Sequence, residues 1–412
     1  MSESRHRARE APRTRRFNWR LAPVVLPGNR VQLLENGAQF FPQLLAAIDG
    51  ARQSLHLETY LIADDKIGQR VLDALTTAAS RGVQVRMVID GFGGGDFARR
   101  IARELAPQGV AVKIFRAERW WRLQRKLLRR LHRKIAVVDE RIAFVGGINI
   151  IDDYTEVPSA GGHSQPRFDF AVKCEGPIVA AIALAAQRLW WTLELVSTPG
   201  PLGPWPRASS TRAPAPVPGG ADATLLLRDN FTHRRTIERA YVQAFESARR
   251  EIVIANAYFL PGRRFRAALR AARSRGVRVR LLLQGHVEYT IQHHAQRALF
   301  GQLLAAGIEI HEYTPSYLHA KVATADDLWA TVGSSNIDPY SFLLAREANV
   351  VVYDESFARR LRERIVSAIE AHARTVRAAE FAQRGLPTRA YDWIAYALVQ
   401  LATVLLARGR NY

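Results

Sequence analysis

The stretch Leu131-His-Arg-Lys-Ile-Ala-Val-Val-Asp139 recurs with the same spacing as Leu318-His-Ala-Lys-Val-Ala-Thr-Ala-Asp326. In each copy a Lys follows the His by two residues and an Asp follows it by seven. A Gly and an Asn follow at the same further spacings in both copies, as Gly146 and Asn149 and as Gly333 and Asn336. One His-x-Lys is an ordinary surface pair, but two copies in register indicate an internal repeat with a shared function.

Each copy predicts a β-hairpin whose turn lies at the Asp. Because residues i and i+2 of a strand point to one face, His132 and Lys134 project together, as do His319 and Lys321. The chain has 59 basic residues, of which only six are Lys, and two of those six stand in the motifs. The motif therefore requires the compact ammonium charge rather than a guanidinium.

Two His and two Lys suit attack on a phosphodiester without metal. One neutral imidazole can act as nucleophile while the other, protonated, serves as general acid. The lysines and nearby Asn amides would stabilise charge on the phosphate oxygens. A carboxylate beside each His would set its tautomer. We expect no metal and no other cofactor.

A second repeat indicates the fold class. Residues 81–91 (RGVQVRMVIDG) are echoed by residues 275–285 (RGVRVRLLLQG), each predicting a helix end, a Gly and a buried strand. Alternation of helix and strand over 412 residues predicts two pseudo-symmetric α/β domains with mixed sheets and one site at their interface. The expected divisions are a basic arm at 1–30, a first domain at 31–197, a linker with seven prolines at 198–221, a second domain at 222–375 and a tail at 376–412.

The formal net charge of +21 calls for a polyanionic partner, either nucleic acid or an anionic membrane. Residues 116–134 combine Arg and Lys with Trp120 and Trp121, which suits a membrane interface, although a solvated helix with one apolar stripe has the same composition. Residues 393–407 are apolar apart from Gln400 and Thr403. Fifteen residues are too few to span a bilayer, so we expect an in-plane or re-entrant anchor, or a helix packed on the protein itself.

The motifs resemble those of the phospholipase D superfamily, whose signature is HxKxxxxD followed by Gly and Asn, present twice per site. Within it the chain is similar to the shorter bacterial cardiolipin synthases, over about residues 30 to 370. The stretches that carry this similarity are Leu33 to Gly37, Leu57 to Tyr60, Leu131 to Lys134, Phe144 to Gly147, Ile254 to Phe259 and Trp329 to Pro339. The resemblance implies transfer of a phosphatidyl group from one phosphatidylglycerol to another through a phosphohistidine, with release of glycerol.

The resemblance also implies roles for individual residues. The catalytic set is His132, Lys134, Asp139, His319, Lys321 and Asp326. His132 and His319 are nucleophile and general acid in an order the sequence leaves open, and we take His132 as the nucleophile. Asp139 and Asp326 are expected at the hairpin turns, where they hold the shape of the motif.

The expected substrate-binding set is Asn149, Asn336, Ser334, Ser335, Gly147, Asp169, Glu347, Glu58 and Asn256. Asp169 and Glu347 stand at matching places in the two halves and are our candidates for orienting the histidines. Glu58 and Asn256 also occupy matching places in the two repeats, either as cleft-floor residues or as ordinary polar residues at strand ends. The first copy has Gly-Gly-Ile-Asn where the second has Gly-Ser-Ser-Asn, which would make the two sides unequal.

We expect an enzyme bound peripherally to the cytoplasmic face of the bacterial inner membrane, with anionic phospholipid as its partner and phosphatidylglycerol as donor and acceptor. A phosphodiesterase that hydrolyses phospholipid or nucleic acid is the alternative, and the Trp pair and the apolar C-terminal stretch count against nucleic acid. A non-catalytic scaffold would not need to keep either Lys. The oligomeric state is not predicted.

Overall fold

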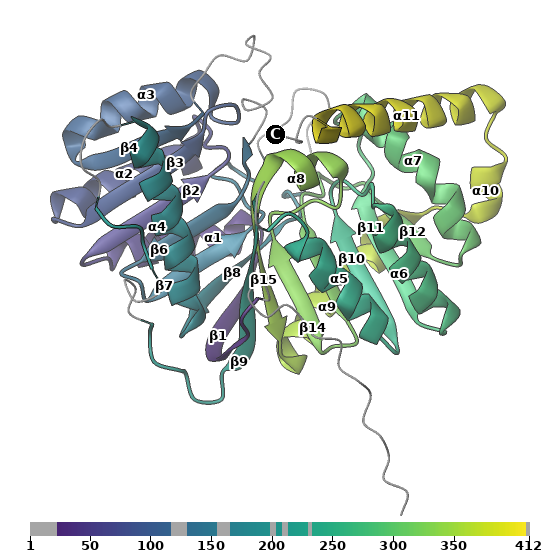
Figure 1. Ribbon diagram of the computed structural model, residues 1–412, viewed down its shortest axis with the longest axis horizontal. Helices are drawn as coiled ribbons and strands as arrows, with labels where there is room; N and C mark the ends of the chain where they lie inside the picture. The colour runs from purple at the N-terminus through teal and green to yellow at the C-terminus, as the bar shows by residue number, and fades with distance from the viewer. Residues whose placement is uncertain are drawn as a thin grey trace, which may run out of the picture.

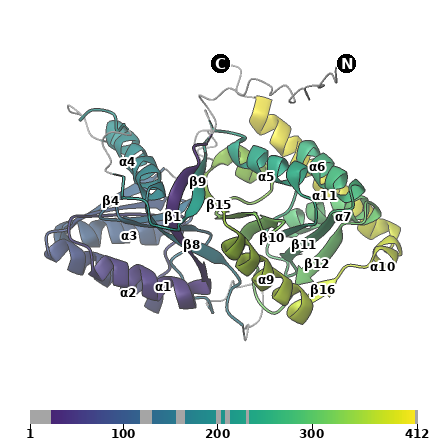
Figure 2. The ribbon, with the colours of Figure 1, turned by 90° about the horizontal axis from the view of Figure 1, so that it is seen from below.

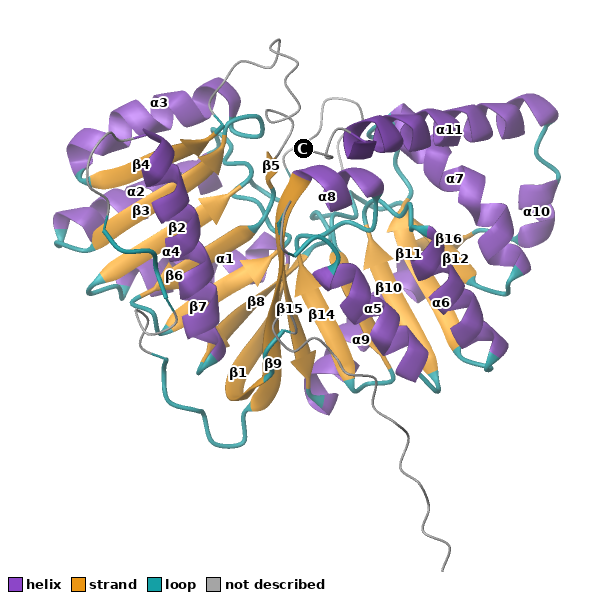
Figure 3. Ribbon diagram, viewed as in Figure 1, coloured by secondary structure: helices purple, strands orange, loops and turns teal. Residues whose placement is uncertain are grey.

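The computed structural model describes residues 23–116, 130–154, 165–197, 203–207, 213–229 and 233–408. Helices cover both faces of one mixed β-sheet, so the predicted α/β class is confirmed (Figures 1 and 3). The expected arm at residues 1–22 and the Trp pair at 120 and 121 lie outside the described residues.

The first half contributes one arm of the sheet, in the order β1-β8-β7-β6-β2-β3-β4. Strands β2, β3 and β4 are parallel to one another, and the remaining neighbours in this arm are antiparallel. Its elements are β1 (Leu26–Glu35), α1 (Asn36–Asp49), β2 (Ser54–Thr59), α2 (Lys66–Ser80), β3 (Gln84–Asp90), α3 (Gly95–Leu105), a 3₁₀ turn (Ala106–Gln108), β4 (Val110–Phe115), β5 (Arg130–Leu131), β6 (Lys134–Val138), β7 (Ile142–Gly146), β8 (Phe170–Glu175) and α4 (Ile178–Ser197).

The second half repeats this order as β9-β15-β14-β13-β10-β11-β12, with β16 added at the edge. Helices α5, α6 and α7 take the places of α1, α2 and α3, and α9 takes that of α4 (Figure 2). Its elements are β9 (Ala221–Arg228), α5 (Thr236–Ser247), β10 (Glu251–Asn256), α6 (Arg263–Ser274), β11 (Arg278–Gln284), α7 (Thr290–Ala305), β12 (Glu309–Tyr313), β13 (Lys321–Ala325), β14 (Trp329–Gly333), α8 (Pro339–Leu344), β15 (Ala345–Tyr353), α9 (Glu355–His372), β16 (Ala373–Thr375), α10 (Ala378–Ala382) and α11 (Leu386–Arg408). The predicted pseudo-symmetry is therefore present strand by strand.

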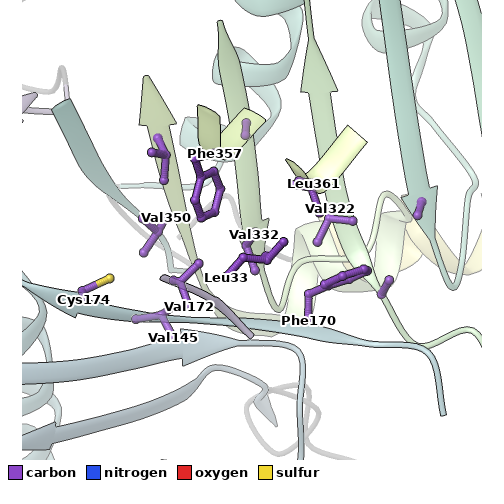
Figure 4. Close-up of a cluster of buried hydrophobic side chains, with 14 of the residues drawn as sticks. Leu33, Val145, Phe170, Val172, Cys174, Val322, Val332, Val350, Phe357 and Leu361 are labelled. Carbon is purple, nitrogen blue, oxygen red and sulfur yellow. The ribbon is translucent and has the colours of Figure 1, made fainter. Parts of the chain in front are cut away.

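The two halves are joined through the sheet itself. Strands β1 and β9 pair antiparallel, with Leu26 opposite Ala223, and so connect the two arms into one sheet. A single apolar core draws on both halves, and Figure 4 shows its side chains meeting. The labelled members are Leu33, Val145, Phe170, Val172 and Cys174 from the first half and Val322, Val332, Val350, Phe357 and Leu361 from the second. Burial of apolar area between the halves fixes their relative position.

Two expected boundaries differ from the structure. Strand β1 begins at Leu26, inside the residues that we expected to form the basic arm. The described end of the Pro-rich segment also contacts β1, since the amide of Val217 donates to the carbonyl of Gly28 at 2.8 Å. Pro and Gly composition predicted a flexible linker, but this hydrogen bond and the pairing of Ala221 with Asn29 hold its end against the sheet.

The C-terminal helix α11 packs on α7 along the edge of the second half (Figure 1). Ala395 and Val399 are buried in the contact, and buried Asp392 bonds to Nδ1 of His294 at 2.7 Å and to Arg384 at 2.6 Å. The other side of α11 exposes apolar side chains at helical spacing, namely Ile394, Leu398, Leu401 and Leu405. Of the alternatives for this segment, the helix is packed on the protein, and it keeps an apolar face outward.

One helix among the described residues has the length and composition of a membrane span, at residues 178–195 of α4. Part of that stretch is already buried, with Ile178, Val179 and Ile182 in the core that both halves share. Helix α4 therefore acts as a core helix of the first half.

Candidate active site

The two hairpins that carry the motifs share an unusual turn. Asp139 and Glu140 have φ of 49° and 52°, and Asp326 and Asp327 both have 54°. Two successive residues with positive φ make the type I′ turn that suits the twist of a hairpin, and Asp tolerates this conformation better than most residues.

The motif aspartates serve these turns and the loops beside them. The Asp139 carboxylate accepts from the backbone amides of residues 52–54, and the Asp326 carboxylate accepts from those of residues 249–251. Seven extended residues separate each Asp from its His, which is about 20 Å. This corrects the inclusion of Asp139 and Asp326 in the catalytic set: they hold the hairpin to the preceding strand.

Each His lies just before its hairpin and is held by backbone bonds to the other half. The amide of His132 donates to the carbonyl of Arg346 at 3.0 Å, and the amide of His319 donates to the carbonyl of Phe168 at 2.9 Å. Strand β5, next to His132, also pairs with β15. The motif of one half is therefore positioned by the backbone of the other.

The orienting carboxylates also cross between the halves. Nδ1 of His132 lies 3.1 Å from Oε2 of Glu347, and Nδ1 of His319 lies 2.6 Å from Oδ2 of Asp169. Ladder registers place Asp169 and Glu347 at equivalent positions, as their sequence context suggested. Since an ionised carboxylate only accepts, each Nδ1 is assigned the proton, which leaves the Nε2 lone pair for chemistry.

The two sides differ at one pair of equivalent positions, which hold Gly147 in the first half and Ser334 in the second. A Cβ at Gly147 would lie 2.3 Å from Oδ1 of Asp169, so only Gly leaves room for that carboxylate. At the matching place Ser334 donates its hydroxyl to Oε2 of Glu347. Both residues therefore position carboxylates, and Gly147 has no side chain with which to bind substrate.

The two motif lysines are buried. Each ammonium donates to the carbonyl of its own motif His, Lys134 at 2.8 Å. Burial and the charge of Lys321 lower the pKa of Lys134 to about 7. Burial also lowers the pKa of Lys321 to about 8, although the charges of Asp169 and Glu347 oppose it. An added phosphate charge would favour both ammonium forms.

Burial lowers the pKa of both histidines. The charge of Lys134 adds to the shift of the His132 pKa, which Glu347 opposes. The pKa of His319 falls well below its usual value because the charges of Lys321 and Lys134 add to burial. The empty site therefore favours neutral imidazoles, as a nucleophile requires.

The two carboxylates differ in charge state. Burial raises the pKa of Asp169 to about 7, against the charge of Lys321. Burial also acts to raise the pKa of Glu347, but the contact with His132 and the charge of Arg228 outweigh it, and the net shift is downward. Near neutral pH Glu347 is ionised while Asp169 is poised to hold a proton.

Both histidines line one cavity of about 470 Å³ at the junction of the halves. Asn149 and Asn336 line it symmetrically, and Arg130 and Arg167 add positive charge. The buried Oδ1 atoms of the two asparagines have no hydrogen-bond partner within the described part of the chain. Buried polar groups are normally paired, so these amides indicate a place for a polar ligand.

Seven of the nine expected substrate-binding residues, and both motif lysines, are not among the residues that line this cavity. Asp169, Glu347 and Ser334 make the contacts described above, and the other four are Gly147, Ser335, Glu58 and Asn256. Glu58 is buried in an ion pair with Arg133, whose guanidinium also donates to the carbonyl of Ala185 in α4 at 3.0 Å. Asn256 accepts from the amide of Ile337 at 3.2 Å, and Ser335 donates its amide to Asn349 at 3.3 Å. All four act in the packing below the site.

The apparent match of Glu58 with Asn256 is also wrong. Across the strand ladders, Glu58 is opposite Ile135 whereas Asn256 is opposite Lys321, which places Asn256 in register with Thr59. The sequence match aligned the two strands on the Tyr that follows each of them, and this alignment differs by one residue from the register in the structure.

The motifs did not reveal several other residues of the site. The ring of Tyr60 meets that of His132 edge-on at 5.0 Å between centroids and lies 5.3 Å from the Lys134 ammonium. Tyr258, Glu288 and Gln292 line the second-half wall. The signal that could have revealed the two tyrosines is that each stands just after a buried strand, although not at equivalent positions.

This arrangement can hold a phosphodiester for in-line displacement. The histidines provide a nucleophile and an acid, and the lysines, arginines and amides provide positive charge and donors for the phosphate oxygens.

Comparison with known proteins points to the same chemistry. Residues 44–157 and 241–368 match the family model described as "Cardiolipin synthase, PLD-like domain". The chain is 40% identical over 352 residues to cardiolipin synthase B of Escherichia coli O6:H1, covering 85% of this chain and 82% of the relative. It is also 40% identical over 339 residues to cardiolipin synthase B of Salmonella typhimurium, covering 82% and 80%.

Among solved structures, phosphatidylserine synthase of Haemophilus influenzae superposes with a TM-score of 0.68 at 14% identity, covering 94% of this chain and 97% of that one, which shows the shared fold. On the family match and the two relatives, the chain belongs to the cardiolipin synthase family of phospholipase D-like phosphatidyltransferases.

Proposed function

We propose that the enzyme joins two phosphatidylglycerol molecules into cardiolipin and glycerol through a phosphohistidine on His132. The single observation that carries the proposal is the pair of imidazoles on one cavity, each with its Nδ1 held by a carboxylate of the other half. This arrangement supports a mechanism in which one imidazole acts as nucleophile and the other as acid on a phosphate bound in the cavity.

In the first step Nε2 of His132 attacks the phosphorus of the donor lipid. The bond from phosphorus to the headgroup glycerol breaks, and His319 gives its proton to the departing alkoxide. Lys134, Lys321 and the two Asn amides stabilise the charge on the remaining phosphate oxygens.

In the second step the headgroup hydroxyl of another phosphatidylglycerol replaces the released glycerol. His319, now neutral, takes the hydroxyl proton while the oxygen attacks phosphorus and the bond to His132 breaks. Cardiolipin leaves and His319 regains its proton, so the cycle is balanced. Water in place of the second lipid gives phosphatidic acid.

The two carboxylates favour His132 as nucleophile. Glu347 is ionised and anchored by Ser334 and Arg228, so it can stabilise the positive charge that develops on His132 during attack. Asp169 has a pKa raised to about 7 and shares its contact with His319, so this pair can store a proton near neutral pH. A stored proton is what the general acid requires.

We place the enzyme peripherally on the cytoplasmic face of the bacterial inner membrane. The exposed apolar stripe of α11, defined above by Ile394, Leu398, Leu401 and Leu405, suits insertion at the headgroup boundary. Helix α11 contacts α8, and α8 supplies Ser341 and Leu344 to the cavity wall. Binding through this stripe would bring the cavity close to the lipid, and the +21 net charge favours anionic headgroups.

The proposal is tested by mass spectrometry of the lipids formed from phosphatidylglycerol vesicles. The wild type should form cardiolipin with one glycerol released per cardiolipin. His132→Ala and His319→Ala should each lower turnover by about 10³-fold or more, while the exposed His372→Ala variant retains near-wild-type rates. Phosphatidic acid without cardiolipin from the wild type would instead identify a hydrolase.

The order of the histidines is tested with a phosphatidyl ester of p-nitrophenol, whose leaving group needs no protonation. His319→Ala should still form a covalent adduct that peptide mapping locates on His132, and His132→Ala should form none. An adduct on His319 would reverse the assignment.

A further inference from the structure

We propose that Glu288, held by Tyr258, forms a headgroup subsite that binds the hydroxyls of glycerol, first in the leaving alcohol and then in the acceptor lipid. The inference rests on the proposed function, because it assigns the part of the substrate that lies beyond the phosphate.

The two walls of the cavity differ in chemistry. The loop between β11 and α7 carries Glu288 and Tyr289 on the second-half wall. The equivalent loop between β3 and α3 in the first half is residues 91–94, Gly-Phe-Gly-Gly, which has no polar side chain to offer. The carboxylate therefore belongs to one side of a site whose His, Lys and Asn residues come in pairs.

Glu288 is held in place by its neighbour. The hydroxyl of Tyr258 donates to Oε2 of Glu288, and burial together with that carboxylate raises the pKa of Tyr258 so that its proton stays on. Oε1 of Glu288 has no hydrogen-bond donor among the described residues. A carboxylate fixed in this way presents a free acceptor to the cavity.

A carboxylate is the wrong group to bind a phosphate, because like charges repel. It must therefore contact an uncharged or cationic part of the substrate. Gln284 and Gln292 line the same wall and add amide donors beside the acceptor. Hydroxyls both donate and accept, so they match this mixed set, whereas an ammonium group can only donate.

The wall that carries Glu288 also carries the general acid. His319 precedes β13, which neighbours β10, and Tyr258 lies just beyond the end of β10. With His132 attacking from the first-half side, the alcohol must lie on the His319 side of the phosphorus. Leaving glycerol and incoming glycerol then occupy the same place, where Glu288 can bind their remaining hydroxyls.

The subsite decides which acceptor takes the phosphatidyl group. Water competes with the second lipid for the phosphohistidine, and a bound glycerol headgroup both aligns its hydroxyl and excludes water. Loss of the carboxylate should therefore lower turnover and also shift the products from cardiolipin toward phosphatidic acid.

The test is the ratio of cardiolipin to phosphatidic acid formed from phosphatidylglycerol vesicles. Glu288→Ala should lower this ratio by about tenfold or more, as expected for loss of a hydrogen bond to a charged group. Glu288→Gln, which retains one acceptor, should lower it less. Tyr258→Phe, which frees the carboxylate without removing it, should also lower the ratio, and the exposed Glu246→Ala on α5 should leave it unchanged.

The outcomes separate this inference from the proposed function. A wild type that forms no cardiolipin overturns the proposed function. A cardiolipin-forming wild type whose ratio is matched by Glu288→Ala overturns the subsite alone. In vesicles with added phosphatidylethanolamine, loss of ethanolamine release in Glu288→Gln with an unchanged ratio from phosphatidylglycerol would show that the carboxylate binds an ammonium, and would also overturn the assignment to glycerol.

Discussion

Nδ1 of His132 lies 3.1 Å from Oε2 of Glu347, a carboxylate 215 residues further along the chain. The reciprocal contact joins His319 to Asp169, 150 residues earlier. Neither half therefore holds both the His and the carboxylate of a pair, and the candidate active site draws on both halves.

Glu347→Gln should lower kcat by about 10² to 10⁴-fold, because the amide can no longer stabilise the imidazolium that forms on His132. The exposed Glu363→Gln on α9 is the matched control and should change kcat little. Adding Glu347→Gln to His132→Ala should cost almost nothing further if the two act as a unit. Full additivity of the two losses would contradict the pairing.

The pH profile of kcat/KM should be a bell. Toward acid pH, protonation of His132 removes the lone pair that attacks phosphorus, so the rate falls, and because burial and the charge of Lys134 lower the pKa of His132, this limb should lie below the range of a free imidazole. Above about pH 8 Lys321 joins Lys134 in losing its charge, so the rate falls toward alkali. Because these ionisable groups interact, the apparent pKa values of the two limbs belong to the group as a whole and not to single residues. Bound phosphate should move the alkaline limb of kcat upward, and a profile flat from pH 6 to 9 would contradict this account.

Lys321→Arg should lower kcat by about 10²-fold or more although the charge is kept. Lys321 is fully buried, with its ammonium on the carbonyl of His319, and a planar guanidinium needs more room. Lys66→Arg, at the start of α2, is the control and should behave as wild type. The measurement is the steady-state rate, with circular dichroism to verify folding. A Lys321→Arg enzyme with wild-type activity would show that any positive charge at this position is enough and that the shape of the ammonium group is not required.

Asp139→Ala and Asp326→Ala should destabilise the fold rather than the chemistry. Each substitution leaves three backbone amides without their carboxylate and places Ala at positive φ, at a cost of about 1–3 kcal/mol in the free energy of unfolding. Urea denaturation measures this cost, with exposed Asp49→Ala expected within about 0.5 kcal/mol of wild type. A stable variant with no activity would return the aspartates to the catalytic set.

Leu398→Asp combined with Leu401→Asp should weaken vesicle binding about tenfold or more, because both side chains belong to the exposed stripe of α11. Leu328 is the control position. It is 64% exposed in the turn between β13 and β14, and it lies beyond the end of β13, whereas His319 precedes the start of that strand. Leu328→Asp should bind vesicles as the wild type does. Flotation of phosphatidylglycerol vesicles measures binding, and equal flotation of all variants would remove α11 from the membrane contact.

Several features followed from sequence because they depend on local backbone preferences. The spacing of His, Lys and Asp predicted a strand followed by a turn. Asp139 and Asp326 have positive φ in these turns, a conformation that Asp tolerates. The contexts of Asp169 and Glu347 matched because β8 and β15 occupy equivalent places in the repeated order of strands. Repeated strands and helices likewise indicated two α/β halves.

Other features depend on contacts between segments distant in sequence, which no local pattern records. The spacing of the motifs did not reveal that each His meets the carboxylate of the opposite half, since the shared apolar core decides how the halves dock. Nor did it separate Glu58, neutralised by Arg133 below the site, from Glu288, which faces the cavity. Sequence by itself determined the repeated His, Lys and Asp residues and their spacing, and tertiary packing decided the partners of these groups, because burial and the direction of a side chain are properties of the assembled sheet.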